Sequence, residues 1–260
     1  MNNYVISLDT SVKRRRHIVE QFDAQNINFK FFDAIEPHKN SKIATDLALN
    51  ISDCDLTQGE VACLLSHVSL WKMMVDQQFN YMAIFEDDIL LGESAELILN
   101  TSTWIPQNAD LIKLEKFAAA AKMKLSAKQV NATRKVRQLI GKHLGAAGYI
   151  LTLDAAKMLL NHVQQQKKLI AVDHILFEVF IENKQLHVLQ ILPGICIQSD
   201  RLYPTEQAIL SDLEFERRQR FDLFFAQQKH TKRSIKDKLN RELMRLMDQI
   251  GLLLGKITFK

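Results

Sequence analysis

Short apolar runs, rich in β-branched and aromatic residues, recur along the first 200 positions of the chain. Each run is bounded by polar or turn-forming residues, which is the pattern of a buried strand. The predicted strands cover residues 4–8 (YVISL), 29–35, 81–85 (YMAIF), 109–115, the beginning of 148–163, and one or two segments of 186–198 that Pro193 and Gly194 interrupt.

Longer stretches with apolar residues three or four positions apart separate these runs and predict amphipathic helices. They cover residues 11–25, 57–78, the second part of 148–163, and 172–184. The helix of 57–78 has the clearest apolar stripe, formed by Val61, Leu64, Leu65, Val68, Trp71 and Val75. Asp154 is expected to cap the helix within 148–163, because aspartate accepts hydrogen bonds from the first helical amides.

Strands and helices therefore alternate from residue 4 to about residue 200, which predicts an α/β domain with a parallel sheet. In open α/β sheets, ligands bind beyond the carboxyl ends of the strands. Three consecutive acids, Glu86, Asp87 and Asp88, directly follow the apolar run of residues 81–85. They are thus expected at the edge of a ligand-binding cleft.

The three carboxylates repel one another, and they are costly to desolvate unless a cation or hydrogen-bond donors compensate them. Alternate residues of an extended segment face the same side, so Glu86 and Asp88 could jointly hold Mg²⁺ or Mn²⁺, which prefers oxygen ligands. The alternative is a solvated turn whose acids cap a helix. The three residues alone leave both interpretations open.

Composition is that of an ordinary globular protein, with 47% hydrophobic and 25% charged residues. No stretch approaches the ~20 apolar residues that cross a bilayer, and the first residues lack the pattern of a signal peptide.

The cysteines, Cys54, Cys63 and Cys196, form no CxxC pair. An odd number of separated cysteines favours the reducing cytosol over a disulfide-stabilised secreted fold.

The net charge of +4 is concentrated in residues 229–260, which hold nine Lys or Arg residues against three acids. Apolar residues recur there every three or four positions from Ile235 to Ile257, which predicts an amphipathic helical tail after a catalytic domain of residues 1–228. Such a helix could dock on its own domain, form a homodimer, or lie on an anionic membrane. Nucleic acid is not an expected partner, because aromatic residues are not interleaved with the basic ones.

A second basic stretch, residues 116–142, follows the predicted strand of 109–115. One interpretation is a solvated loop and helix face. The other is a positively charged lid over an anionic ligand, since long loops near active sites often close over them.

Five motifs occur in an order that resembles glycosyltransferase family 25, the bacterial lipooligosaccharide and LPS galactosyltransferases, which are related to collagen galactosyltransferases. They are residues 4–16, residues 59–71 together with 83–88, and residues 109–115, 143–159 and 172–177. The resemblance extends over about residues 4 to 205. It implies a GT-A-like fold, in which a mostly parallel nucleotide-binding sheet is flanked by helices.

The resemblance also implies a metal and donor site. Asp88 is the first candidate for a direct ligand of Mn²⁺ or Mg²⁺, and Glu86 and Asp87 would contact the ion directly or indirectly. Alternatively, one of the three acids would contact the donor ribose. The implied donor-binding residues are Ser7, Leu8, Arg14, Arg15, His67, Glu86 and Asp87. An arginine fork suits a diphosphate, although Arg14 and Arg15 could equally be the exposed start of a helix.

Asp173 matches the acidic residue that serves the family as general base, a role compatible with capping the helix it precedes. The implied acceptor and sugar pocket comprises Glu115, His143, Gly145, Gln198 and Ser199. The family often has a Gly-Thr pair where this chain has Gly145 and Ala146, so a hydroxyl contact from that position is lost. Cys63 is expected in the core rather than as a nucleophile, since nothing near it in sequence would activate it.

The implied activity is inverting, metal-dependent transfer of a hexose to a lipooligosaccharide. The expected donor is UDP-galactose, the linkage is β, and the acceptor is a lipid-linked oligosaccharide at the cytoplasmic face of the inner membrane, which the tail could contact peripherally. Alternatives are a UDP-glucose or UDP-N-acetylglucosamine transferase and an inactive membrane-associated binding module. A metal-dependent phosphoesterase would be expected to show more clustered His and Asp ligands.

Overall fold

The computed structural model describes residues 1–202 and 255–260. In these ranges the strands are β1 (Asn2–Ser7), β2 (Lys30–Asp33), β3 (Tyr81–Glu86), β4 (Ile89–Leu91), β5 (Leu111–Lys113), β6 (Met123–Gln129), β7 (Lys135–Leu139), β8 (Gly148–Thr152), β9 (Val188–Leu192) and β10 (Cys196–Gln198). The helices are α1 (Val12–Asp23), η1 (Pro37–Lys39), α2 (Asn40–Asp46), α3 (Gln58–Asp76), α4 (Glu96–Leu99), α5 (Leu153–Gln165), α6 (Val172–His174), η2 (Ile175–Val179), α7 (Phe180–Glu182) and α8 (Ser199–Leu202).

The central sheet of the described part has eight strands in the order β2-β1-β3-β8-β5-β9-β7-β6. Six of the strands run in one direction, while β7 and β8 run in the opposite one. The predicted α/β class with a mostly parallel sheet is therefore confirmed. A small antiparallel sheet of β10 and β4 adjoins it.

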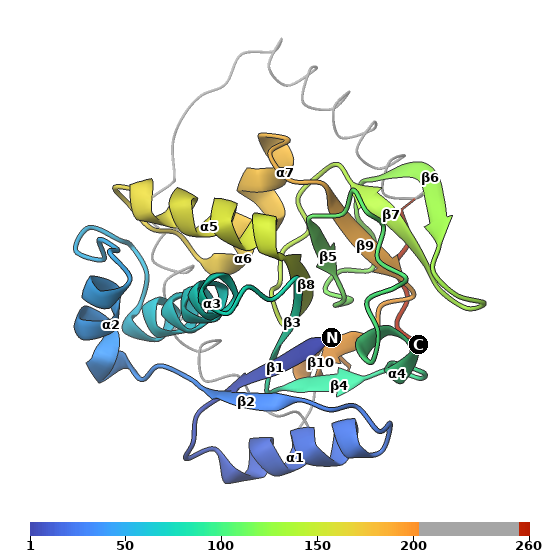
Figure 1. Ribbon diagram of the computed structural model, residues 1–260, viewed down its shortest axis with the longest axis horizontal. Coiled ribbons are helices and arrows are strands. Elements are labelled where there is room, and N and C mark those ends of the chain that lie inside the picture. Colours follow the sequence, from blue (N-terminus) through green and yellow to red (C-terminus); the bar gives the residue numbers. More distant parts are fainter. Residues whose placement is uncertain (203–254) are drawn as a thin grey trace, which may run out of the picture.

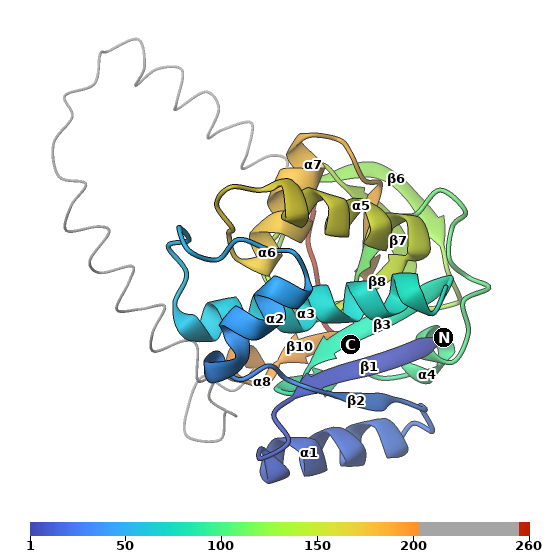
Figure 2. The same cartoon turned by 60° about the vertical axis from the view of Figure 1, so that its left-hand side comes forward.

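Helices cover both faces of the central sheet, as Figures 1 and 2 show. Successive side chains of a strand point to opposite faces of the sheet, so β3 contributes side chains to the core on each face. Met82 and Ile84 belong to the apolar core that includes α3 and α5, whereas Ala83 and Phe85 belong to the core that includes α1 and α4. A strand buried on both faces has no polar alternation, which explains why the sequence of β3 is continuously apolar.

The N-termini of the two long helices on one face are capped by threonines. The helix predicted over 57–78 is confirmed. Thr57 and Glu60 form a reciprocal capping box that fixes the start of α3. At α5 the cap is Thr152, whose hydroxyl accepts from Ala155 N at 3.2 Å. The expectation of Asp154 as cap is wrong, and this residue lies instead in the exposed first turn.

Two segments differ from the predicted elements. The helix expected over 172–184 is a helical stretch in which the central turn, η2, is a π-helix. The basic stretch of 116–142 contains the antiparallel pair β6 and β7 rather than a loop and helix face. Only Met123 of β6 is buried, so this edge strand carries no alternating pattern by which its sequence would reveal it.

Residues 203–254 contain most of the predicted tail and the proposed boundary at residue 228, so these expectations lie outside the described residues. The final six residues do not continue a helix: Lys256 and Phe259 form bridges with Ala120 and Gly194, and Ile257 is buried. The helix expected through Ile257 is therefore wrong over residues 255–260. Within the described ranges, no helix is both long enough and apolar enough to traverse a membrane.

Candidate active site

The carboxyl ends of β1 and β3 and the N-terminal half of α3 line a cleft of about 260 Å³. Part of its lining is apolar, from Ile6, Leu8, Ala34, Ile35, Pro37 and Ala62. The other part is polar and includes Ser7, Arg14, Cys63, His67, Glu86, Asp87 and Asp88. The sheet thus brings together acids that were predicted at the edge of a cleft and a surface on which a flat ring could pack.

The three consecutive acids make contacts in three different directions. Glu86 is the last residue of β3, and Asp87 and Asp88 form the turn before β4, so their side chains diverge. Glu86 faces His67 on α3, Asp87 faces β1 and α1, and Asp88 faces β10. Mutual repulsion is reduced in this way, and each carboxylate has its own role.

Asp87 joins β1 and α1 to the end of β3. Its Oδ2 accepts from the Ser7 hydroxyl at 2.6 Å, and its Oδ1 accepts from Arg14 Nη1 at 3.0 Å. Both carboxylate oxygens are thus hydrogen-bonded inside a nearly buried site. We infer that Asp87 mainly holds Ser7 and Arg14 at the cleft.

Asp88 is the acid best suited to bind a hard cation. It is buried, its Oδ2 accepts from Gln198 Nε2 at 3.2 Å, and its Oδ1 has no hydrogen-bond partner among the described residues. Burial raises the pKa of Asp88 well above its usual range, and the charges of Glu86 and Asp87 act in the same direction. A divalent cation would offset this repulsion and satisfy Oδ1, so the residues fit the implied Mn²⁺ or Mg²⁺.

Gln198 and Ser199, expected at the acceptor, both contact Asp88. The Gln198 amide donates to the carboxylate, and Ser199 N donates to the Asp88 carbonyl at 2.9 Å. Pairing of β10 with β4 sets this register, with Gln198 opposite Ile89. The two residues are therefore placed to orient Asp88.

Arg15, expected at the diphosphate, does not line the cleft. Its guanidinium donates to the carbonyls of Leu8 and Ser7 at 3.0 and 2.9 Å, pairs with Asp33, and lies over the ring of Phe31. These contacts fix the turn after β1. Arg14, one residue earlier, is the arginine that reaches the cleft.

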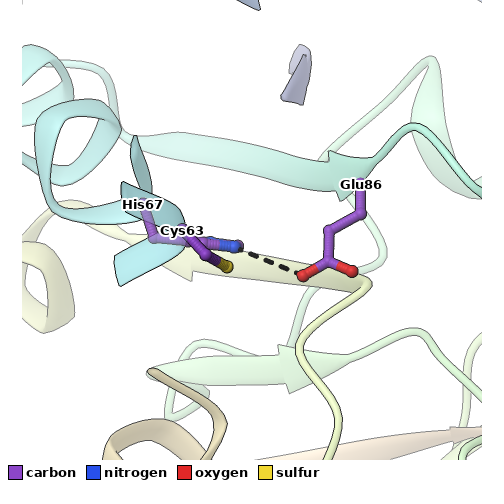
Figure 3. A group of neighbouring side chains, drawn as sticks. All are labelled: Cys63, His67 and Glu86. Atoms are coloured by element: carbon purple, nitrogen blue, oxygen red, sulfur yellow. Dashed lines mark ion pairs between the residues drawn. The ribbon is translucent and has the colours of Figure 1, made fainter. Parts of the chain in front are cut away.

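His67 stands between the core and the cleft, on the face of α3 that meets β3. Its Nε2 lies 3.6 Å from Glu86 Oε1, and its Nδ1 is 2.8 Å from the Tyr149 hydroxyl. The dashed line in Figure 3 marks the contact between His67 and Glu86. Trp71 Nε1 donates to the same hydroxyl at 3.0 Å. These aromatic contacts set the orientation of the imidazole toward Glu86 and the cleft.

A buried ion pair lies behind the cleft on β5 and the residues that follow it. Lys113 Nζ is 3.1 Å from Glu115 Oε2, it donates to the Gly145 carbonyl, and both side chains are inaccessible to solvent. Glu115 Oε2 also accepts from Ala147 N at 3.2 Å. The Glu115 carboxylate, expected in a sugar pocket, therefore holds the segment of residues 145–147.

That segment connects the acids to the candidate base. Ala147 O accepts from Glu86 N at 3.1 Å, and Gly145 N donates to Asp173 Oδ2 at 3.3 Å. Gly145 has φ +88°, and a Cβ there would come within 2.6 Å of Glu115 and still closer to Phe117. Glycine is required at this position both by the backbone conformation and by the space.

Asp173 is partly exposed at the start of α6, and its Oδ1 accepts from His174 N at 2.9 Å. The helix-capping expectation is wrong, because α6 begins one residue earlier: Ala171 is the N-cap, and Asp173 lies within the first turn, where its second oxygen contacts Gly145. Asp173 does not line the cleft of about 260 Å³. It contacts the 145–147 segment at Gly145, whereas Glu86 contacts the same segment at Ala147.

His143, also expected in the sugar pocket, has both ring nitrogens engaged. Ala118 N donates to Nε2 at 3.2 Å, so the proton is on Nδ1, which donates to Gln190 Oε1 at 3.0 Å. Burial, with a further contribution from the charge of Lys113, lowers the pKa of His143 to about 3. His143 therefore holds the loop at Ala118 through the hydrogen bond to its Nε2.

This depressed pKa predicts acid sensitivity. Between pH 6.5 and 3 the unfolded chain binds a proton at His143 that the folded chain does not, so the free energy of unfolding falls as pH is lowered. The slope from this residue is at most about 1.4 kcal/mol per pH unit. Urea unfolding of His143→Gln should be less dependent on pH than that of the wild type over this window.

The matched control is His38→Gln, because the His38 side chain is 68% exposed and folding changes its solvation little. Its unfolding curves should shift with pH as those of the wild type do. Parallel curves for His143→Gln and the wild type from pH 6.5 to 4 would show that His143 does not carry this dependence.

Lys113 and Cys63 are site residues whose roles the sequence did not reveal. Lys113 and Glu115 are two residues apart in an extended segment and hence face the same side, a signal that could have indicated their pairing. No comparable local signal joins Cys63 to Glu86, because these residues are far apart in the chain.

The chain is similar to known proteins over most of its length. The family description "Glycosyltransferase family 25 (LPS biosynthesis protein)" matches residues 1–176. The lipooligosaccharide biosynthesis protein lic2B of Haemophilus influenzae is 35% identical over 223 residues, which is 83% of this chain and 82% of that protein. The lacto-N-neotetraose biosynthesis glycosyltransferase LgtE of Neisseria gonorrhoeae is 33% identical over 231 residues, 84% of this chain and 82% of LgtE. Among solved structures, an active-site mutant of LgtC gives a TM-score of 0.38 at 12% identity, with 83% of this chain and 82% of that chain covered.

Proposed function

The chain belongs to glycosyltransferase family 25, and from this premise we propose that it transfers galactose from UDP-galactose, in β-linkage and with inversion, to a lipid-linked oligosaccharide. The observation that carries the proposal is the cleft at the carboxyl ends of β1 and β3, which combines apolar lining with the carboxylates of Glu86 and Asp88. The galactosyl donor and the β-linkage follow the family resemblance of the motifs.

The chain's own residues provide for each part of the donor. The apolar lining near Ile6 and Ile35 suits the uracil ring, and Arg14, held by Asp87, is near enough to the acids to serve a diphosphate. Asp88 and Glu86 would hold a divalent cation, Mn²⁺ or Mg²⁺. When bound, this ion supplies Lewis-acid stabilisation of the negative charge on the leaving diphosphate.

In the transfer step, the acceptor hydroxyl oxygen bonds to the anomeric carbon as the bond to the donor diphosphate breaks. The electron pair of the broken bond leaves on UDP, and Asp173 takes the hydroxyl proton as general base. Hydrogen bonds from Gly145 N and His174 N orient the Asp173 carboxylate, which stays partly exposed to receive the acceptor.

Asp173→Asn should reduce kcat by about 10²- to 10⁴-fold, the usual contribution of a positioned general base. The amide oxygen of asparagine can accept from one of the two backbone donors, Gly145 N or His174 N, but the amide cannot take the proton. UDP binding, measured by calorimetry, should stay within about twofold, because the proposed role is on the acceptor side.

Asp154→Asn, at an exposed acid in the first turn of α5, is the matched control and should retain full activity. Turnover by Asp173→Asn within a factor of three of the wild type would exclude Asp173 as the base.

The test of the proposed function is calorimetric titration of UDP, UDP-galactose and UDP-glucose into the protein with and without Mn²⁺. Metal-dependent binding of UDP, tighter for UDP-galactose than for UDP-glucose, is expected. Absence of binding from a folded protein under every condition would contradict the transferase proposal and favour an inactive binding module. Preference for UDP-glucose would preserve the reaction and change the donor.

We also propose that the enzyme works at the cytoplasmic face of the inner membrane, with residues 229–260 as a peripheral contact. The basis is the nine basic residues of this segment and the lipid-linked acceptor. Co-sedimentation of the full chain with anionic but not with neutral vesicles is expected. Absence of co-sedimentation with either kind of vesicle would argue for docking or homodimerisation, which sedimentation velocity would then distinguish.

A further inference from the structure

A second group of potential metal ligands adjoins the donor cleft. Cys63, His67 and Glu86 each offer one ligand atom, and these three atoms lie within 4.8 Å of one another (Figure 3). Cys63 and His67 are four residues apart on α3 and hence on one face of the helix. Glu86 comes to the same point from the end of β3. All three residues line the cleft.

His67 has the environment of a metal-binding histidine. Its side chain is fully buried, and Nε2 is aimed at the group without a hydrogen-bond partner among the described residues. In the tautomer with the proton on Nδ1, that proton is donated to the Tyr149 hydroxyl 2.8 Å away. An acceptor behind the ring is what fixes the tautomer and orientation of histidines that bind metals.

The chemistry of the three atoms indicates the class of ion. A thiolate, an imidazole and a carboxylate together suit Zn²⁺, whereas Mg²⁺ and Mn²⁺ prefer oxygen ligands alone. Zinc–ligand bonds of about 2.0–2.3 Å require the ligand atoms to lie roughly 3.5 Å apart. The partly exposed side chains of Cys63 and Glu86 can supply this small approach toward the buried imidazole.

We propose that Cys63, His67 and Glu86 form a Zn²⁺ site with three protein ligands and a fourth position open to the cleft. The site is distinct from the oxygen site at Asp88, with which it shares Glu86. Zinc binding draws the Glu86 carboxylate toward α3. If the proposed function holds, Zn²⁺ therefore antagonises Mn²⁺-dependent UDP binding; the zinc site itself does not depend on that function.

The test uses Co²⁺ as a spectroscopic substitute for Zn²⁺ in the full chain. Coordination by a thiolate gives an intense near-ultraviolet charge-transfer band. The wild type should show this band at one Co²⁺ per chain, and Zn²⁺ should abolish it. Cys63→Ser should lose the band and bind Zn²⁺ at least about 100-fold more weakly.

Cys54→Ser is the matched control, since Cys54 is also partly buried and its Sγ is 3.2 Å from the Ile51 carbonyl, away from the group. It should retain the band. Absence of a thiolate band in the wild type, or its persistence in Cys63→Ser, would overturn the proposal.

A measurement on the wild type alone guards against a variant that fails to fold. Alkylation of each cysteine by iodoacetamide is followed by peptide mass spectrometry with and without Zn²⁺. Zinc should slow alkylation of Cys63 by at least tenfold and leave Cys54 unaffected. Equal rates at Cys63 in both conditions would contradict the site.

Discussion

Asp88→Asn is expected to abolish Mn²⁺-dependent UDP binding and to reduce the rate of sugar transfer by about 10³-fold or more. Asp88 provides the buried carboxylate oxygen that has no hydrogen-bond partner among the described residues, and the proposed cation contributes several kcal/mol of charge stabilisation in the transition state. Asparagine keeps the size of the side chain and can still accept from Gln198, but it lacks the charge that binds the cation.

The same substitution should stabilise the metal-free protein. Asp88 is buried beside Glu86 and Asp87, whose charges oppose its ionisation, so loss of the charge relieves repulsion in the folded state. The free energy of unfolding, measured in urea without metal, should rise by on the order of 1 kcal/mol. Loss of function together with a gain in stability separates a functional carboxylate from a structural one.

Asp76→Asn is the control for Asp88→Asn. Asp76 is an exposed acid on α3 whose ion pair with Lys72 is solvated, so metal-dependent binding and stability should both change little. Retention of Mn²⁺-dependent UDP binding by Asp88→Asn would remove Asp88 from the metal site and leave Glu86 as the remaining candidate of the acidic run.

Lys113→Met is expected to destabilise the protein by about 3–5 kcal/mol, the range found when one partner of a buried ion pair is removed. Lys113 neutralises Glu115, and its ammonium lies 4.1 Å from the centre of the Phe177 ring. Without it, the Glu115 carboxylate is buried and has lost its ion-pair partner. Because segment 145–147 depends on this pair, activity should also fall.

A double variant tests the cause. Lys113→Met combined with Glu115→Gln removes both charges, so its loss of stability should be smaller than the sum of the two single losses. Burial already raises the pKa of Glu115, and loss of Lys113 raises it further, so the deficit of Lys113→Met should shrink as pH is lowered and Glu115 binds a proton.

Lys72→Met, which removes the exposed partner of Asp76, is the matched control and should cost less than about 1 kcal/mol. A loss of this small size for Lys113→Met, or strict additivity in the double variant, would mean that the buried pair contributes no more than a surface pair.

Local patterns in the sequence were sufficient to predict most of β1, β3, β5, α1, α3 and α5. The apolar run of β3 and the capping residues Thr57 and Glu60 act within a few positions, so they can be recognised without knowledge of the rest of the fold. The position of Glu86, Asp87 and Asp88 at the cleft follows from the same local information, because a parallel strand has its carboxyl end at the binding edge.

The errors have physical reasons as well. Thr152 rather than Asp154 caps α5, because β8 extends to Thr152 and the helix begins immediately after it. The strands β6 and β7 were not predicted, because β6 is an edge strand with a single buried residue and pairing with β7, rather than burial, defines it.

By itself, the sequence determined the α/β class, the succession of elements and the place of the acidic run, since each depends on the periodicity of neighbouring residues. Only the tertiary structure decided what those residues do. It directed the acids to three different partners, paired Lys113 with Glu115 behind Gly145, and brought Cys63 and His67 to Glu86. Side-chain chemistry at a site depends on contacts between distant segments, and these contacts are fixed by how β1, β3, β8, β10 and α3 pack together rather than by spacing along the chain.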